Sequence, residues 1–169
     1  KDFRNKMGRI EKEMQVGISK ANDRSGIENM PPDVVNQSHY ISNSAHCPPY
    51  KNTTVEYLPM GEVKFERMVQ ELKKAKRYIF MEYFIIQEGT MWNTILDVLE
   101  EKAKEGVDVR VIYDDMGCIL TLPTGYEKTL REKGIQCQIF NPFIPILSSH
   151  FNTRDHRKIC VIDGNVGFT

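Results

Sequence analysis

A histidine and a lysine near the C-terminus are the residues best suited to do chemistry. His156 and Lys158 lie two positions apart in an apolar run. Side chains alternate along a β-strand, so a strand would project both to the same side. A neutral imidazole can attack phosphorus and hold it covalently, and an ammonium can stabilise the charge that grows on the non-bridging oxygens. The pair suits phosphodiester chemistry, although His-x-Lys alone more often describes a strand cap beside a solvated lysine.

An aspartate and a glycine complete the pattern. Asp163 and Gly164 precede Asn165, a sequence typical of a tight hairpin turn. Strand alternation no longer governs direction at a turn, and a carboxylate there can hold a neighbouring backbone or side chain in place. The plain alternative is a turn with no further role. The whole spacing, His-x-Lys, four residues and then Asp-Gly, is far more specific than any of its parts.

This spacing resembles the His-x-Lys-x4-Asp signature of the phospholipase D superfamily. Residues 152–169, NTRDHRKICVIDGNVGFT, are similar to the corresponding segment of bacterial cardiolipin synthases. Two further stretches carry the same resemblance, EYFII from Glu82 and VRVIYDDMG from Val109. The resemblance covers residues 55–169 well and residues 1–54 weakly. It is strongest to the N-terminal catalytic half of such an enzyme.

The resemblance implies a mechanism and a set of partners. His156 would be the nucleophile that forms a phosphohistidine, Lys158 would bind the phosphate oxygens, and Asp163 would support the site. Neither a metal ion nor another cofactor is implied. The expected reaction moves a phosphatidyl group from one phosphatidylglycerol to a second, giving cardiolipin and glycerol. The parent protein is expected at the cytoplasmic membrane, in contact with the membrane surface.

The chain departs from the superfamily pattern in two ways. It stops at Thr169, before the small residues and the asparagine that normally follow the motif. It also lacks the second motif, whose histidine serves as the general acid in the superfamily and which belongs to the C-terminal half of the parent protein. A general acid contributes about 10²–10⁴ in rate. We therefore expect this chain alone to be nearly inactive, unless two copies pair as a homodimer and complete a site.

Other charged residues are weaker candidates for substrate binding. Glu82 interrupts an apolar run, and a buried carboxylate needs a partner; it either hydrogen-bonds a site group or points outward from an edge strand. Asp114 follows a predicted strand, where ligand contacts are common in α/β sheets, but a plain turn fits equally. Arg154 and Arg157 flank the motif and could meet a lipid phosphate or lie at a solvated surface.

An apolar segment directly precedes the motif. Residues 140–151 include Phe143 and Ile146 between prolines. A loop this apolar is either buried or in contact with lipid. We expect Phe143 and Ile146 to line the acyl-chain side of a substrate entrance.

The elements that must position these residues read as an α/β domain. Strands are predicted at 55–58, 78–86, 107–113, 135–140, 158–162 and 166–169, and helices at 62–76, 91–105 and 124–133. The run 78–86 is nearly continuous in apolar residues, which is typical of a strand covered on both sides. The fold class is therefore a mixed β-sheet with helices on both faces. Residues 1–54 are expected to form a helix over 1–20 and a connector with one short helical turn, before a domain at 55–169.

Composition narrows the function classes. Lys plus Arg and Asp plus Glu each number 23, so the net charge is zero, and the basic excess typical of a nucleic-acid binder is missing. The four cysteines suggest no disulfide framework or zinc spacing. No apolar run reaches the roughly 18–20 residues that span a bilayer. Three functions stay open: a lipid phosphatidyltransferase, another phospholipase-D-type hydrolase or nuclease, and a non-catalytic binding module.

Overall fold

A computed structural model describes residues 26–45, 47–143 and 154–169. The chain divides into two compact units, residues 1–57 and residues 58–169. The helix predicted over residues 1–20 lies outside the described residues.

The first unit contains one described helix, α2 (Pro32–Ser44). The sequence predicted only a short helical turn here, because the segment lacks a clear apolar stripe. The structure forms a helix of 13 residues that buries none of its side chains. Its start follows local rules: a proline occupies the first turn, where no backbone N–H is needed, and Asp33 places a negative charge near the helix N-terminus.

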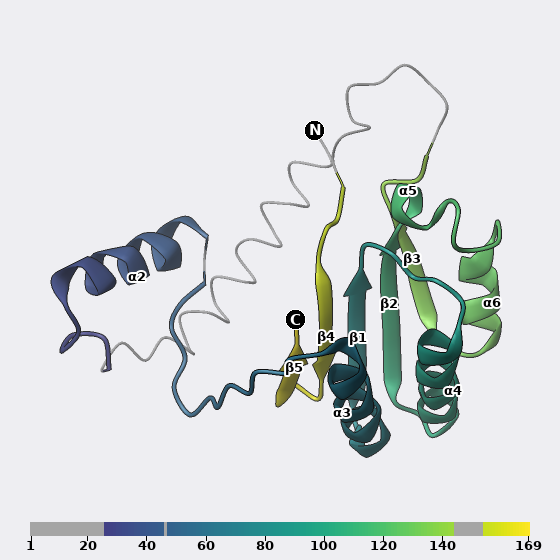
Figure 1. The fold of residues 1–169 in the computed structure, drawn as a ribbon, viewed down its shortest axis with the longest axis horizontal. Coiled ribbons are helices and arrows are strands. Elements are labelled where there is room, and N and C mark those ends of the chain that lie inside the picture. Colours follow the sequence, from purple (N-terminus) through teal and green to yellow (C-terminus); the bar gives the residue numbers. More distant parts are fainter. Residues whose placement is uncertain (1–25, 46, 144–153) are drawn as a thin grey trace. The chain divides into compact units, whose positions relative to one another are not determined.

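The second unit is built on a five-stranded sheet with the order β3-β2-β1-β4-β5 (Figure 1). The central strand β1 (Tyr78–Tyr83) pairs in parallel with β2 (Asp108–Asp114), and β2 pairs in parallel with β3 (Gln136–Phe140). On its other side, β1 pairs antiparallel with β4 (Lys158–Ile162), which pairs antiparallel with β5 (Val166–Phe168). The predicted mixed α/β class is confirmed.

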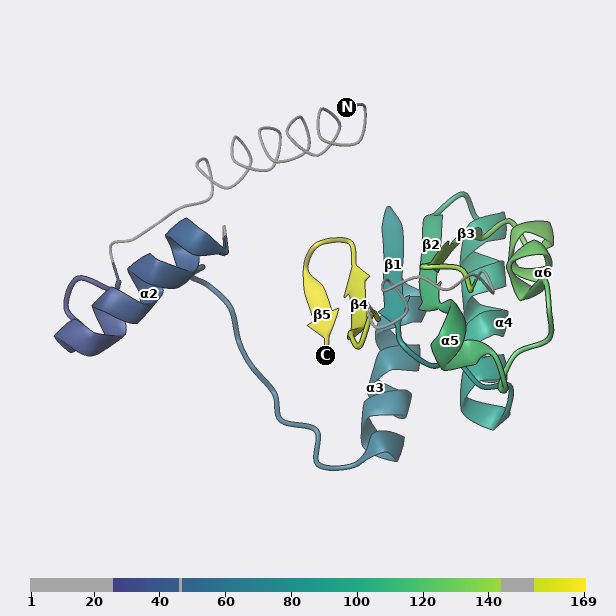
Figure 2. The same ribbon diagram turned by 90° about the horizontal axis from the view of Figure 1, so that it is seen from above.

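Helices α3 (Gly61–Lys74), α4 (Thr90–Lys104) and α6 (Tyr126–Glu132) cover one face of this sheet (Figure 2). Every second strand residue faces them and is buried, which places the core between the sheet and these helices. The core residues supplied by the strands are Ile79, Met81, Val109, Val111, Tyr113, Cys137, Cys160, Ile162 and Phe168. A four-residue helix, α5 (Asp115–Cys118), directly follows β2.

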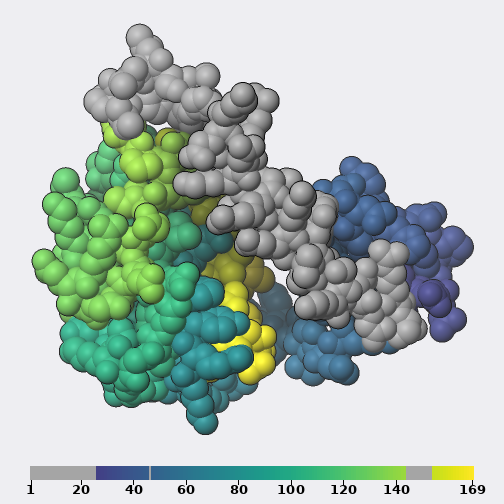
Figure 3. Space-filling view, turned by 180° about the vertical axis from the view of Figure 1, so that it is seen from behind, coloured from purple at the N-terminus to yellow at the C-terminus, as the bar shows by residue number. Residues whose placement is uncertain are grey.

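The opposite face of the sheet differs from the prediction of helices on both faces. None of the helices described in the second unit packs there, and the hairpin of β4 and β5, drawn in yellow, reaches the surface in the view from behind (Figure 3). Phe80 and Ile112 are 36% and 37% exposed on this face. The reason is that polar residues occupy alternate strand positions, such as Glu82, Arg110 and Gln138. The strands are therefore patterned for one buried face.

Two predicted strands are shorter or missing. Residues 55–58 form no strand, and Val55 is 93% exposed, because an alternating pattern needs a partner strand to become one. The strand predicted over 78–86 ends at Tyr83. The chain then leaves the sheet at Phe84.

The turn between β4 and β5 follows the predicted hairpin chemistry. Asp163 and Gly164 have φ values of 54° and 74°, and the amide of Asn165 donates to the carbonyl of Ile162 at 3.0 Å. Two consecutive positive φ angles define the tight hairpin turn that Asp-Gly favours. A Cβ at position 164 would lie 2.6 Å from the hydroxyl of Tyr78, so a larger residue would also displace that side chain.

Candidate active site

Apart from Asp163, the predicted site residues that the structure describes lie where the three parallel strands end. Strand β4 runs antiparallel to β1 and begins with Lys158 opposite Tyr83, the last residue of β1. The segment carrying His156 therefore lies at the carboxyl edge of β1, β2 and β3. The strand order also reverses between β1 and β4, and ligands of open α/β sheets bind at such a switch point.

His156 and Lys158 face the same aromatic ring. The imidazole of His156 lies 4.0 Å from the ring of Phe84, centroid to centroid, and the ammonium of Lys158 lies 5.2 Å from the same ring. The ammonium also donates to the carbonyl of His156 at 2.5 Å. Both side chains are exposed. An imidazole and an ammonium thus lie close together at the surface, although His156 itself precedes the first residue of β4.

Phe84 is a site residue that the sequence reasoning missed. Its amide donates to the carbonyl of Arg157 at 3.0 Å, which extends the pairing of β1 and β4 by one bond. Gly117 lies against its carbonyl, where a Cβ would approach to 2.2 Å. The only signal in the sequence was its place in the EYFII stretch, which does not distinguish a core phenylalanine from one that contacts a histidine.

Asp163 lies at the opposite end of β4. Its carboxylate accepts hydrogen bonds from the backbone amides of Lys76, Arg77 and Tyr78 at 2.9, 2.8 and 2.9 Å. These bonds lower the pKa of Asp163 below its ordinary value, and the bond from the Tyr78 amide has the largest effect. The five residues of β4 separate it from the histidine end by roughly 16 Å, at about 3.3 Å per residue. The structure therefore does not bring Asp163 together with His156. The carboxylate of Asp163 instead binds the backbone at the start of β1.

Asp114 is a buried junction beneath the site. It is fully inaccessible to solvent, and its carboxylate accepts from the amides of Gly117 and Asp155 at 2.9 and 3.0 Å. It also pairs with the guanidinium of Arg154 at 3.3 Å. That guanidinium donates in addition to the carbonyl of Asn141 at 3.2 Å. Arg154 is consequently turned inward, linking the ends of β2 and β3 to the segment before His156.

Glu82 and Arg157 form an ion pair on the other side of the motif. The guanidinium of Arg157 lies 3.1 Å from the carboxylate of Glu82. The side chain of Arg157 is 69% exposed, so it can also meet a ligand. Burial raises the pKa of Glu82, whereas the guanidinium of Arg157 lowers it. Asp155, the residue just before His156, is buried and was also missed, because a charged residue beside a motif gives no sequence signal of burial.

A group of exposed apolar side chains lies on the loops at this edge of the sheet. We call it the apolar rim, and it consists of Ile85, Met116, Ile119, Leu120 and Phe143. Three hydrogen bonds connect the loops that carry it: Thr121 to the carbonyl of Ile86, the amide of Ile86 to the thiol of Cys118, and the amide of Phe143 to Asp115. Phe143 was predicted from the sequence. Ile146 lies outside the described residues.

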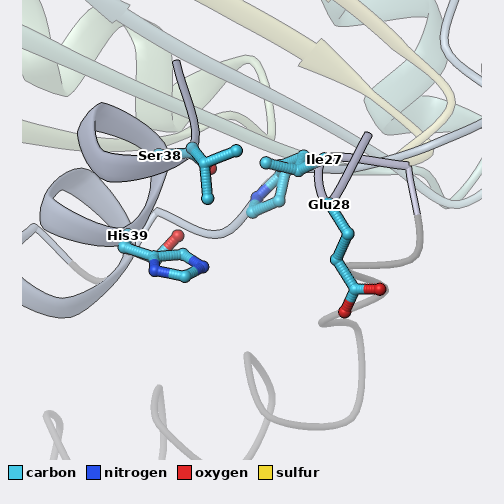
Figure 4. Close-up of a pocket in the computed structure, with 7 residues that line it drawn as sticks. Ile27, Glu28, Ser38 and His39 are labelled. Atoms are coloured by element: carbon cyan, nitrogen blue, oxygen red, sulfur yellow. The ribbon is translucent and has the colours of Figure 1, made fainter. Parts of the chain in front are cut away.

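A hollow away from these residues contains none of the predicted site residues. It has a volume of about 190 Å³ and lies in the first unit (Figure 4), lined by Ile27, Glu28, Val35, Ser38, His39, Ser42 and Pro49. In the part of the chain that the structure describes, no three His, Cys, Asp or Glu side chains are close enough to hold a metal ion. No helix of the described ranges has the length and apolar character needed to cross a membrane.

Comparison with known proteins assigns the family. The family model described as the phospholipase-D-like domain of cardiolipin synthase matches residues 68–169. The chain belongs to this family. The matched range includes Glu82, Asp114, the His156 motif and the turn at Asp163.

Cardiolipin synthases are also among the relatives. That of Oceanobacillus iheyensis is 36% identical over 118 residues, which is 70% of this chain and 24% of that protein. One from Staphylococcus aureus is 39% identical over 109 residues, 64% of this chain and 22% of that protein. An uncharacterized protein of Streptococcus mutans is 50% identical over 133 residues, 79% of this chain and 29% of that protein. The chain thus spans about a quarter of the length of these relatives.

Proposed function

We propose that this chain supplies one half of the active site of a cardiolipin-synthase-type phosphatidyltransferase. The observation that carries the proposal is the placement of His156 and Lys158 against one ring, exposed at the carboxyl edge of the sheet. Membership of the phospholipase-D-like family supports it, as do the relatives that carry the name cardiolipin synthase.

The reaction proceeds in two displacements at phosphorus. The imidazole of His156 attacks the phosphorus of a phosphatidylglycerol, a P–N bond forms, and the P–O bond to the glycerol headgroup breaks. The departing oxygen takes its proton from a general acid outside this chain. The hydroxyl of a second phosphatidylglycerol then attacks phosphorus and gives its proton to the group that had acted as general acid, the P–N bond breaks, and cardiolipin and the free histidine result. Lys158 stabilises the charge on the non-bridging oxygens in both steps.

Phe84 and Asp163 position these groups. The ring of Phe84 supports the imidazole and attracts the ammonium of Lys158 through a cation–π contact. Asp163 acts from a distance, because its three backbone contacts anchor the start of β1 against the end of β4. In this proposal it maintains the pairing of β1 with β4 and does not exchange protons with the substrate.

The apolar rim favours a lipid as the substrate. It presents Leu120, 94% exposed, and Ile119, 49% exposed, on the edge of the sheet where the motif lies. Such side chains suit acyl chains at a membrane surface, while the exposed Arg157 suits a headgroup phosphate. The zero net charge argues against nucleic acid. We place the parent protein at the cytoplasmic membrane, with Phe143 beside the entering acyl chains.

In this proposal the general acid comes from another polypeptide segment. We propose that it lies in the C-terminal half of the parent protein, or in a second copy of this chain paired as a homodimer. Turnover by this chain alone is therefore expected to be about 10²–10⁴-fold below that of a completed site. The matching test adds a separately produced C-terminal half to this chain and measures cardiolipin formation.

A trapping experiment on the full natural protein tests the proposal. Phosphatidylglycerol with a labelled phosphate should leave an acid-labile, base-stable adduct that peptide mapping places at His156. The variant His156→Asn should lose the adduct, whereas the exposed control His39→Asn should keep it. Lys158→Met should slow adduct formation, and the exposed control Lys128→Met should not.

The outcomes also separate the alternatives. Transfer of the labelled group to water in place of a second lipid would indicate a phospholipase-D-type hydrolase, and a labelled adduct from a nucleotide ester alone would indicate a nuclease. Absence of any adduct in the full natural protein would contradict an enzymatic role and favour a binding module.

A further inference from the structure

An uncharged loop follows β2 at the edge of the sheet where the motif lies. Residues 116–124, MGCILTLPT, contain no charged side chain, although charged residues make up 27% of the chain. The segment begins in α5, which lies beyond the end of β2 (Figure 1). Its tip consists of Ile119 and Leu120, which are 49% and 94% exposed. One exposed leucine carries little information, so the surroundings of the tip decide its meaning.

Two neighbouring loops bring further apolar side chains to this tip. Ile85, from the loop after β1, is 48% exposed, and Phe143, from the loop after β3, is 41% exposed. The hydroxyl of Thr121 bonds the first of these loops to the tip, and Asp115 bonds the second to the start of α5. The apolar rim is therefore a group built from three loops, and such a group marks an interaction surface.

Hydrogen bonds hold the tip in its exposed position. The amides of Thr121 and Leu122 both donate to the carbonyl of Cys118 at 3.0 Å, and the hydroxyl of Thr121 donates to the carbonyl of Ile86 at 2.6 Å. Leu122 packs against the core. The chain on both sides of Leu120 is thus anchored, and its exposure is built into the loop. An apolar environment accepts a loop only where backbone groups have partners, and these bonds supply part of them.

We propose that the tip of this loop inserts into the acyl-chain boundary of a lipid bilayer and holds the carboxyl edge of the sheet at the level of the phosphate headgroups. The loop then anchors the domain to the membrane whether or not a substrate is bound. Its benefit for catalysis rests on the proposed function, because it requires His156 to attack a lipid phosphate. The anchoring itself does not depend on that reaction.

Exposed cations beside the apolar rim match an anionic membrane surface. The ammonium of Lys158 lies 5.2 Å from the ring of Phe84, and Ile85 is the next residue of the chain. The side chain of Arg157 is 69% exposed. An apolar tip beside such cations is the arrangement that binds anionic interfaces. Glu82 offsets the charge of Arg157, so we expect the apolar tip to supply most of the affinity.

The depth of insertion sets which parts of the domain stay in water. Segments of this kind enter a bilayer by about 5–10 Å, which is enough for the loops at the carboxyl edge only. The last turns of α3 and α4 lie at the opposite edge of the sheet, where β1 and β2 begin (Figure 1). Their lysines, Lys73, Lys74, Lys102 and Lys104, should therefore remain in water.

Tryptophan fluorescence of the full chain tests the insertion directly. Trp92 is the single tryptophan, so reporters are placed in a Trp92→Phe background. On vesicles of phosphatidylcholine and phosphatidylserine in equal amounts, neither being the proposed substrate, Leu120→Trp should emit at shorter wavelength and be quenched by brominated acyl chains. Lys73→Trp, exposed in the last turn of α3, should show neither effect. A reporter at position 120 that stays unquenched, or equal quenching at both positions, would overturn the proposal.

Vesicle sedimentation provides a second measurement with the native tryptophan in place. Leu120→Ser should weaken binding about tenfold or more, because burial of a leucine side chain contributes at least that factor. The matched control is Val55→Ser, since Val55 is 93% exposed but lies outside the rim, and it should change binding little. Both side chains are exposed, so urea unfolding should be the same in the two variants. Equal binding by wild type and Leu120→Ser would count decisively against the anchor.

Two further outcomes distinguish this inference from the other proposals. If the separately produced C-terminal half shielded the Leu120→Trp reporter and prevented its quenching by vesicles, the rim would be an interface between halves, and the anchor would be overturned. If the reporter inserted but the full natural protein formed no phosphohistidine, the proposed function would fail while the anchor stood. If phosphohistidine formed at His156 but the reporter stayed in water, this inference alone would fail.

Discussion

Replacement of Asp163 by alanine tests whether this motif residue maintains the fold or takes part in chemistry. The substitution removes the acceptor for three backbone amides, those of Lys76, Arg77 and Tyr78. These amides join the end of α3 to the start of β1. We expect the junction to open in the variant while His156 and Lys158, at the other end of β4, keep their mutual geometry.

The magnitude follows from the bonds that are lost. Each hydrogen bond contributes about 1 kcal/mol net, so three contribute about 3 kcal/mol, reduced to about 1.5 kcal/mol because water can replace a partly exposed acceptor. The φ of 54° at this position adds about 1 kcal/mol for alanine, which dislikes the left-handed region. The expected loss is about 2–3 kcal/mol. Asp163→Asn should lose about 1 kcal/mol, since asparagine tolerates this φ and keeps one acceptor oxygen.

Urea unfolding of the full chain measures the loss, and amide hydrogen exchange locates it. At neutral pH, Lys76, Arg77 and Tyr78 should exchange faster in Asp163→Ala. The pKa of Asp163 is lowered in the folded state. Its stabilisation is therefore fully present above the ordinary value of 3.8 and is lost as the pH falls through the lower folded value. The difference between wild type and variant should shrink in that acidic range. Asp97→Ala, on the exposed face of α4, is the matched control and should change stability little.

Two results would refute this reasoning. One is a folded Asp163→Ala variant with wild-type stability and unchanged exchange at the three amides. The other is a variant of full stability that forms no phosphohistidine, because that outcome would assign Asp163 a direct part in the chemistry.

Three further substitutions probe the site and the core. Gly117→Ala should lower both the melting temperature and turnover, because its Cβ would lie 2.2 Å from the carbonyl of Phe84 and would displace the ring beneath the histidine; an unchanged Tm would contradict this contact. Asp114→Asn should lower the free energy of unfolding in urea by about 3 kcal/mol. The two carboxylate oxygens of Asp114 each accept from a backbone amide, so the buried NH₂ group of asparagine would face one N–H that loses its acceptor; a loss below about 1 kcal/mol would contradict the role of Asp114 as a buried junction. Trp92→Phe should cost about 1–2 kcal/mol by removing the 2.7 Å bond to the buried hydroxyl of Tyr126, and Tyr126→Phe should then add little further loss.

Local rules were sufficient to predict much of this chain. Strand β4 was predicted with its observed bounds, because an apolar run before Asp-Gly has few other solutions. The same rule predicted the hairpin turn at Asp163. Residues 55–58 had a strand pattern as well, yet they form no strand. A strand needs a partner strand, and the local sequence does not determine whether one is present.

The tertiary structure decided which polar groups face solvent and which hold the site. Arg154 and Arg157 looked equivalent in the sequence, but the first is drawn inward by Asp114 and the second lies largely exposed beside Glu82. The burial of Asp155 depends on Asp114, 41 positions earlier in the chain, and the contact of Phe84 with His156 depends on where β1 ends. Sequence periodicity reports how a segment divides between two faces. Only the packing of distant segments determines which face becomes dry, and therefore which charges must find a partner.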